Sequence, residues 1–256
     1  MTQALPHVSL DSSRLIRFLT DLSVSEAQVS HQQFSDKLGQ LINFADAIAL
    51  SEAHTQAPEL EDEGIGEFRD GITTEFLRAR SSIVQAAMRS FFPSSGPTRI
   101  RWPAIEAEPT TDSASAAVVL LKFYRAQQVD IYGKVRGLHQ RTRDAVAQLS
   151  PKLSRIAALD AALSDALGSH SQRYFNAVPK LLERRVEYLH GQFLAARDHQ
   201  QSEGAAWAEI CEQLRREVQG LLLAEVEVRL LPALGLVEAL NQDIHDVPDK
   251  EIPDEN

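Results

Sequence analysis

The sequence contains only one cysteine, Cys211, and no apolar stretch long enough to cross a membrane. A single cysteine cannot form an internal disulfide, which fits a reducing compartment. The densest apolar stretches, residues 116–121 and 230–236, fall far short of the roughly 20 apolar residues that a membrane-spanning helix needs. The start of the chain shows no cationic end followed by an apolar run, so we expect no secretory signal. These absences predict a soluble cytoplasmic protein.

Aromatic residues, glycine and proline are also scarce. Aromatics make up 6% of the 256 residues, and there are only 12 Gly and 11 Pro, which indicates helix-rich packing on Leu, Ala and Val. The hydrophobic content of 43% and the charged content of 24% are ordinary for a globular protein. A chain of this length can bury a sizeable core, as one large domain or two small ones.

The net charge of −10 is distributed unevenly along the chain. Residues 113–199 carry 13 Lys or Arg and 7 Asp or Glu, whereas residues 1–112 carry 9 and 16, and residues 200–256 carry 4 and 13. This basic middle between acidic ends either attracts its own flanks within the fold or forms a patch for an acidic partner.

The strongest pattern is a series of nine positions at alternating steps of three and four residues, which we term the 121–149 seam. Its members are Leu121, Tyr124, Gln128, Ile131, Val135, Leu138, Thr142, Ala145 and Leu149. Seven of them are apolar or aromatic, so one stripe of a helix of roughly nine turns must be buried. We expect a single long helix from about residue 113 to residue 149.

Two partners could cover this seam. One is another chain, in a coiled coil, and the other is the helices of the same molecule that begin at Pro179 and near Ser202. We favour the intramolecular packing, although a long helix can pack at one end and protrude at the other. The polar Gln128 and Thr142 within the seam indicate a partly wet interface.

The rest of the chain is a succession of helical patterns with no strand pairs. The spacing of apolar residues predicts helices over 14–22, 30–48 and about 67–91, separated by irregular segments at 52–66 and 92–112. In the second irregular segment, Ile100 and Trp102 are expected to attach the chain to the helical body. Whether the two irregular segments become ordered on binding is left open.

Helix signals also divide the second half of the chain. Ser150 suits an N-cap and Pro151 the first helical position, Gly168 suits a C-terminal stop, and Pro179 predicts a further helix start. In the last helix, Pro232 is expected to introduce a kink or a restart.

These patterns predict an all-α helical bundle with one long helix, antiparallel neighbours and no β-sheet. The expected parts are an N-terminal helical pair at 1–52, a loop-rich segment with one helix at 53–112, the main helical bundle at 113–242, and a disordered acidic tail at 243–256.

A line of cations lies beside the seam on the predicted long helix. We term Lys122, Arg125, Arg136 and Arg143 the basic stripe; Tyr132 and Gln140 occupy intervening helical positions. Lys180, Arg184 and Arg185 on a later helix could enlarge the patch. The candidate partner-binding residues are Lys122, Arg125, Tyr132, Arg136, Arg143, Arg184 and Arg185.

An alternative interpretation of the stripe is nucleic-acid binding, with the cations along a phosphate backbone and Tyr132 stacking on a base. Three features count against it. The protein is acidic overall, the stripe flanks the seam as the charges of a coiled coil do, and no known nucleic-acid-binding motif accompanies it.

A second alternative is a metal-dependent enzyme. Glu187 and His190 have the spacing used by di-iron carboxylate bundles, but those sites need two such pairs and two further glutamates, and no second Glu-x-x-His is present. We therefore expect His190 to be a partly buried structural histidine. Cys211 lies on the apolar face of its helix and is expected to be a packed hydrophobe rather than a nucleophile. The sequence predicts no cofactor.

Gly133 and Gly137 stand four residues apart on the long helix, on the face opposite the seam. Small residues at this spacing permit close approach of another helix. A weak point that bends is an equally good interpretation, because each glycine destabilises a helix interior by about 1 kcal/mol relative to alanine.

Five stretches resemble a bacterial family that is catalogued only as a domain of unknown function, mainly in beta- and gammaproteobacteria. They are RLIRFLTDL at 14–22, FADAIAL at 44–50, IAALDA at 156–161, VPKLLERR at 178–185 and LLLAEVEVRL at 221–230. The resemblance covers most of the chain except the two irregular segments and the acidic tail. None of these motifs is catalytic in the family, so no functional residues carry over.

Members of that family are similar to proteins often encoded beside a coiled-coil inner-membrane protein and an OmpA- or MotB-like peptidoglycan-binding protein. The resemblance therefore implies a cytoplasmic partner of an envelope-anchored assembly, similar to ion-driven motor-type defence systems. The residues themselves predict a non-enzymatic interaction or accessory protein that binds one or more protein partners. Association of the chain with itself is left open.

Overall fold

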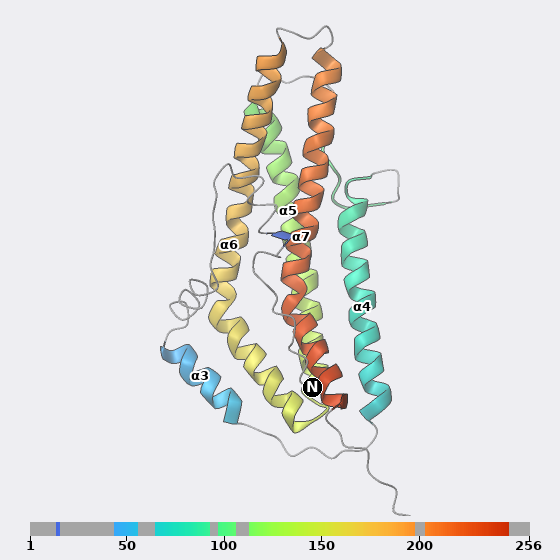
Figure 1. Cartoon of the computed structure of the whole chain (residues 1–256), viewed down its shortest axis with the longest axis vertical. Helices are drawn as coiled ribbons and strands as arrows, with labels where there is room; N and C mark the ends of the chain where they lie inside the picture. The colour runs from blue at the N-terminus through green and yellow to red at the C-terminus, as the bar shows by residue number, and fades with distance from the viewer. Residues whose placement is uncertain are drawn as a thin grey trace, which may run out of the picture.

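The computed structural model describes residues 14–15, 44–55, 65–92, 97–105, 113–197 and 203–245, and within these ranges it contains helices and no strand. The helices are α3 (Phe44–Thr55), α4 (Ile65–Arg89), α5 (Ser113–Val146), α6 (Pro151–Arg197) and α7 (Glu203–His245) (Figure 1). The prediction of an all-α fold is confirmed. Among the described helices, none combines the length and the apolar character needed to cross a bilayer.

Three long helices, α5, α6 and α7, lie side by side along the long axis of the molecule, and each contacts the other two (Figure 1). The short connection at 147–150 makes α6 antiparallel to α5. Phe193 near the end of α6 contacts Trp207 near the start of α7, so α6 is antiparallel to α7 as well. The prediction of antiparallel neighbours is therefore confirmed for these two pairs, and α5 and α7 point the same way.

The remaining helices pack on this three-helix body. α4 contacts α5 and α7, and α3 lies against α6. Phe76 and Ile83 of α4 belong to the same apolar core as residues of α5, α6 and α7. Near the N-terminus, Leu15 is buried in this core, and Arg14 Nη1 lies 3.2 Å from Glu227 Oε1 on α7. Most of the predicted helix at 14–22, and the acidic tail beyond residue 245, lie outside the described residues.

The 121–149 seam is buried inside the molecule. Every member is buried except Ala145, which is partly exposed. α5 covers the seam up to Val146 and continues as a turn in which Ala147 N donates to Arg143 O at 2.9 Å. The prediction that this segment forms a single long helix is confirmed up to Val146, and the seam packs against α6 and α7 of the same chain, which are longer still.

The start of α6 follows the sequence closely. Pro151 is its first residue, and the Leu153 backbone N–H donates to Ser150 Oγ at 3.2 Å. This bond satisfies one of the donors left unpaired at a helix N-terminus, so Ser150 is the N-cap as predicted.

The prediction that Gly168 stops this helix and that Pro179 starts another is wrong. α6 is continuous over both residues. Pro179 has no backbone N–H, so the carbonyl of Phe175, four residues earlier, loses its helical donor. Gln128 of α5 replaces that donor, because its Nε2 donates to Phe175 O at 3.0 Å. A side chain from the neighbouring helix thus keeps α6 intact where its own backbone cannot.

Two other boundaries also differ from the sequence patterns. α7 continues through Pro232, so the predicted restart does not occur. α3 extends to Thr55, so residues 52–55, which were expected to be irregular, are helical.

Residues 97–105 are attached to the helical body by an aromatic cluster. The Trp102 ring lies 5.4 Å from that of Phe91 and 5.3 Å from that of Phe123, measured between centroids. The Trp102 backbone N–H donates to Ser90 O at 2.7 Å, and Ile100 packs against the core. The predicted attachment by Ile100 and Trp102 is confirmed.

Candidate functional site

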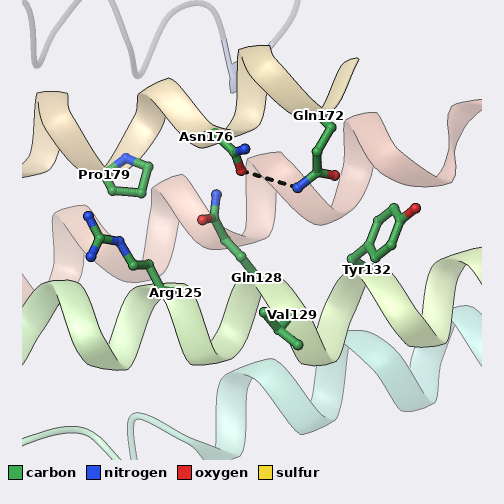
Figure 2. Close-up of a pocket in the computed structure, with 7 residues that line it drawn as sticks. All are labelled: Arg125, Gln128, Val129, Tyr132, Gln172, Asn176 and Pro179. Carbon is green, nitrogen blue, oxygen red and sulfur yellow. Dashed lines mark hydrogen bonds between the residues drawn. The ribbon is translucent and has the colours of Figure 1, made fainter. Parts of the chain in front are cut away.

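An open groove of about 400 Å³ lies between α5 and α6. Its lining consists of Arg125, Gln128, Val129, Tyr132, Gln172, Asn176 and Pro179 (Figure 2). The first four belong to α5, which presents them at steps of three, one and three residues. The last three belong to α6, at steps of four and three residues. Both helices therefore turn one edge toward the groove, which we term the α5–α6 groove.

Gln128 joins the groove to the interior. Besides its bond to Phe175 O, its Nε2 lies 3.1 Å from Glu225 Oε1 and 2.9 Å from Glu225 Oε2. The sequence pattern indicated a partly wet position here. The structure instead buries Gln128 and uses its amide to connect α5, α6 and α7.

Glu225 of α7 is the centre of a buried polar network that also includes Tyr124, Gln128 and Arg229. Tyr124 Oη donates to Glu225 Oε2 at 2.8 Å, and Arg229 Nε donates to Glu225 Oε1 at 2.8 Å. The Arg229 guanidinium also lies 3.7 Å from the centroid of the Phe175 ring. Glu225 is fully buried, and the Arg229 side chain is 7% exposed.

This network is arranged to hold helices together. Burial, together with the charge of Glu225, raises the pKa of Tyr124 well above its ordinary value, so the phenol remains a donor. Both oxygens of Glu225 already accept hydrogen bonds from within the chain. A carboxylate that is saturated and closed to solvent is a structural group, and the network has no reactive atom open to a substrate.

The outer side of α5 carries six residues at steps of four, three, four, three and four. These are Val118, Lys122, Arg125, Val129, Tyr132 and Arg136, and we term them the exposed face of α5. Val129 is 73% exposed, Val118 65% and Tyr132 43%. Within the described part of the chain, no ion pair is formed by Lys122, Arg125 or Arg136. Three members of the basic stripe and Tyr132 therefore share one exposed helix face.

The fourth member of the basic stripe, Arg143, is engaged inside the molecule. Its Nε donates to Asp160 Oδ2 at 2.7 Å, its Nη2 donates to Ser164 Oγ at 2.9 Å, and only 15% of its side chain is exposed. His139 Nε2 lies 2.7 Å from the same Asp160 oxygen. Burial by itself would raise the pKa of Asp160, but the hydrogen bonds from His139 and Arg143 outweigh it and lower that pKa.

Arg185 is engaged in the same way. Its Nε and Nη2 donate to the two carboxylate oxygens of Glu217 on α7, at 2.9 and 2.6 Å. Burial alone would raise the pKa of Glu217, but the bonds from Arg185 and Gln213 lower it. Arg184 and Lys180, by contrast, are exposed on α6. The candidate cations thus divide into exposed ones and ones already paired between helices.

The other candidates have structural surroundings. His190 is buried beside Phe193 and Trp207, and Glu187 is exposed. Cys211 is buried with Phe193 and Trp207, as predicted for a packed hydrophobe. Among the residues that the structure describes, no group of three or more His, Cys, Asp or Glu has an arrangement able to hold a metal ion.

The two glycines of α5 are not contact points between helices. A Cβ added at Gly133 would meet no atom within 4 Å, and one added at Gly137 would meet only Arg141 Nη1, at 3.5 Å, on the same helix. Close approach of a neighbouring helix is therefore not the reason for glycine at either position.

A family model for a protein of unknown function, DUF3348, matches residues 1–242. The chain belongs to this family. The match extends over all the described helices apart from the last residues of α7. No curated protein and no solved structure matches the chain. The description of the DUF3348 family names no activity, so any function must be argued from the groove and the exposed face of α5.

The buried network was missed at the sequence level, although one signal for it exists. Glu225 and Arg229 continue the three-four spacing of the apolar residues Val218, Leu221 and Leu222. A glutamate and an arginine four residues apart in an apolar register indicate a buried ion pair. The partner residues on α5 could be assigned only once the helices were placed beside one another.

Proposed function

We propose that this member of the DUF3348 family is a non-enzymatic helical interaction protein, which binds a protein partner through the exposed face of α5. The observation that carries the proposal is the division of α5 into two faces. One face, the 121–149 seam, is buried in the chain's own core, and the other presents exposed apolar side chains between cations without described partners.

The composition of this face is typical of an interface. Exposed Val118, Val129 and Tyr132 alternate along it with cations, and large apolar side chains exposed among charged residues are found at interaction sites in soluble proteins. Arginine and tyrosine are enriched at the centres of interfaces, and here Arg125 and Tyr132 both line the α5–α6 groove. The saturated buried network beneath the groove supports a rigid scaffold role.

The finer form of the proposal places the protein in the cytoplasm as a partner of an envelope-anchored assembly of the OmpA- or MotB-like type. This part depends on the family resemblance, whereas the interaction role itself depends on the exposed face of α5. Nucleic-acid binding through the same cations is the competing function, and it predicts binding that weakens steeply with salt.

The test is affinity purification of the full chain from its native cell, followed by mass spectrometry. The test variant combines Val129→Asp with Arg125→Glu on the exposed face of α5. The matched control combines Leu77→Asp with Arg78→Glu, an apolar and a cationic residue that are both exposed on α4.

We expect the wild type and the control to recover the same stoichiometric protein partner, and the test variant to lose it. Recovery of that partner by the test variant would contradict the proposal. So would a wild-type protein that is monomeric and purifies alone. A shift of DNA or RNA at low salt that the test variant abolishes would favour the competing function.

A further inference from the structure

The chemistry of the exposed face of α5 restricts what can bind there. We infer that the partner presents an acidic amphipathic α-helix, which lies along α5 and extends into the α5–α6 groove. The inference rests on the proposed interaction function and specifies the partner surface that this function requires.

The shape of the site fits a helix. Val118 and Arg136 are 18 residue steps apart, which correspond to about 27 Å or five turns of helix at 1.5 Å per residue. The members of the exposed face of α5 recur at alternating steps of four and three residues, the spacing at which one helix packs along another. Pro179 and Asn176 of α6 form the second wall of the groove, so a helix resting on Val129 and Tyr132 has a support at its side.

The charges on the exposed face of α5 determine which charge the partner helix must carry. Arg143 and Arg185 are each paired with a carboxylate of the chain, and so is Arg229. Lys122, Arg125 and Arg136 have no such partner in the described part of the chain. Carboxylates of a partner helix would pair with them, whereas a basic helix would be repelled.

The groove offers a place for one of these carboxylates. Arg125 lies in its lining beside two amide side chains, Gln172 and Asn176. Gln172 Nε2 donates to Asn176 Oδ1 at 3.1 Å (Figure 2), which uses the acceptor of Asn176 and leaves its amide N–H groups as donors. A guanidinium and an amide donor in one groove are suited to a carboxylate of glutamate or aspartate.

Two other occupants match the face less well. A second copy docked by a two-fold axis through this face would place cations against cations, because such an interface brings the same patch of both subunits together. A nucleic-acid backbone would place charged phosphates against the exposed side chains of Val118 and Val129, which would gain no apolar contact there.

The experiment compares two synthetic helical peptides of about 25 residues with the same leucine seam. One peptide carries glutamate and the other lysine at the positions that flank the seam. Binding to the full-length protein is measured by fluorescence anisotropy at low and high salt. Binding of both peptides is also measured for the double variant Arg125→Glu/Arg136→Glu and for a control, Arg78→Glu/Arg80→Glu, on the exposed surface of α4. Circular dichroism confirms that each variant is folded.

We expect the glutamate peptide to bind the wild type and the control at least about tenfold more tightly than the lysine peptide, a difference of about 1.4 kcal/mol. We expect Arg125→Glu/Arg136→Glu to reverse this preference, and salt to weaken the glutamate complex. Equal binding of both peptides, no binding of the glutamate peptide, or an unchanged preference in the double variant would overturn the inference.

A separate measurement shows whether a negative result rejects only the acidic helix or also the proposed interaction function. A photo-crosslinking amino acid at position 129 in the native cell identifies the segment that contacts α5. We expect a crosslinked peptide with acidic residues around a three-four apolar pattern. A crosslink to a basic or non-helical segment of a protein would reject the acidic helix and retain the interaction function. A crosslink only to nucleic acid or to this chain itself would reject both the inference of an acidic partner helix and the proposed binding of a protein partner.

Discussion

At the scale of single residues, the most informative side chain is Glu225. It is fully buried, yet it is charged and bonded to Tyr124, Gln128 and Arg229. A buried ion pair contributes little net stability compared with apolar residues, but removal of one partner leaves an uncompensated charge in the interior.

We predict that Glu225→Ala lowers the free energy of unfolding by about 3–5 kcal/mol, because Arg229 loses its carboxylate while it remains buried. The double variant Glu225→Leu/Arg229→Met is expected to be less destabilised than Glu225→Ala alone. Urea unfolding followed by circular dichroism measures both. A double variant that is less stable than Glu225→Ala would contradict the account of an uncompensated buried charge.

Asp160 provides a prediction on pH. Its pKa is lowered in the folded protein from an ordinary value of 3.8, so the folded state favours the ionised carboxylate more than the unfolded state does. The stabilisation is therefore fully present well above pH 3.8 and is lost as the pH falls through the depressed folded-state pKa.

We expect Asp160→Asn to reduce the pH dependence of unfolding in this acidic range, because asparagine does not titrate. The free energy of unfolding is measured from pH 7 down to about pH 2, next to a control with Asp165→Asn, an exposed carboxylate on the same helix. If the free energy of unfolding of Asp160→Asn fell with pH in parallel with that of the wild type, the contacts of Asp160 with His139 and Arg143 would contribute nothing to the acid dependence of stability.

At the scale of secondary-structure elements, α6 depends on a residue outside itself. Pro179 leaves the carbonyl of Phe175 without a helical donor, and Gln128 of α5 supplies one. This coupling predicts that the loss in free energy of unfolding caused by a substitution of Gln128 depends on the residue at position 179.

We predict that Gln128→Ala is less destabilising in a Pro179→Ala background than in the wild type, by about 1 kcal/mol, the net value of one hydrogen bond. The reason is that an alanine in place of Pro179 would restore the backbone N–H that bonds Phe175 O within α6. The four proteins of this double-mutant cycle are compared by urea unfolding. Additive effects would mean that Gln128 does not substitute for the missing N–H, and that its importance comes from Glu225 alone.

At the scale of the whole molecule, one apolar core extends over several segments of the chain. Phe76, Phe91 and Trp102 lie in the same core as Tyr124, Leu182 and Leu221. α4 contacts α5 and α7, the Trp102 ring lies against Phe123 of α5, and Ile105 O accepts a hydrogen bond from Trp207 Nε1 of α7. The division of the chain into a loop-rich segment at 53–112 and a main bundle stays a prediction from the sequence pattern.

We predict that this shared core makes the described body unfold as one cooperative unit. Trp102 reports on the region where residues 97–105 meet α5, and Trp207 on the contact between α6 and α7. Trp102→Phe and Trp207→Phe each leave one tryptophan. In each variant, the denaturation midpoint by fluorescence should coincide with that by far-ultraviolet circular dichroism. Midpoints separated between the two signals of one variant would indicate independently unfolding parts.

The sequence by itself determined the features that depend on local spacing. The three-four repeat of the 121–149 seam predicts the long helix and its buried side, because 3.6 residues per turn place those positions on one stripe. The pair Ser150 and Pro151 predicts the start of α6, because capping involves only neighbouring residues.

Only the tertiary structure decided which distant residues meet. It joins Gln128 to Phe175, which keeps α6 continuous across Pro179, and it buries Glu225 against Tyr124. It also pairs Arg143 with Asp160 while Arg125 remains exposed, although both belong to the basic stripe. Periodicity places these residues on a helix face, but whether a cation on that face is exposed or paired depends on the helix that packs beside it.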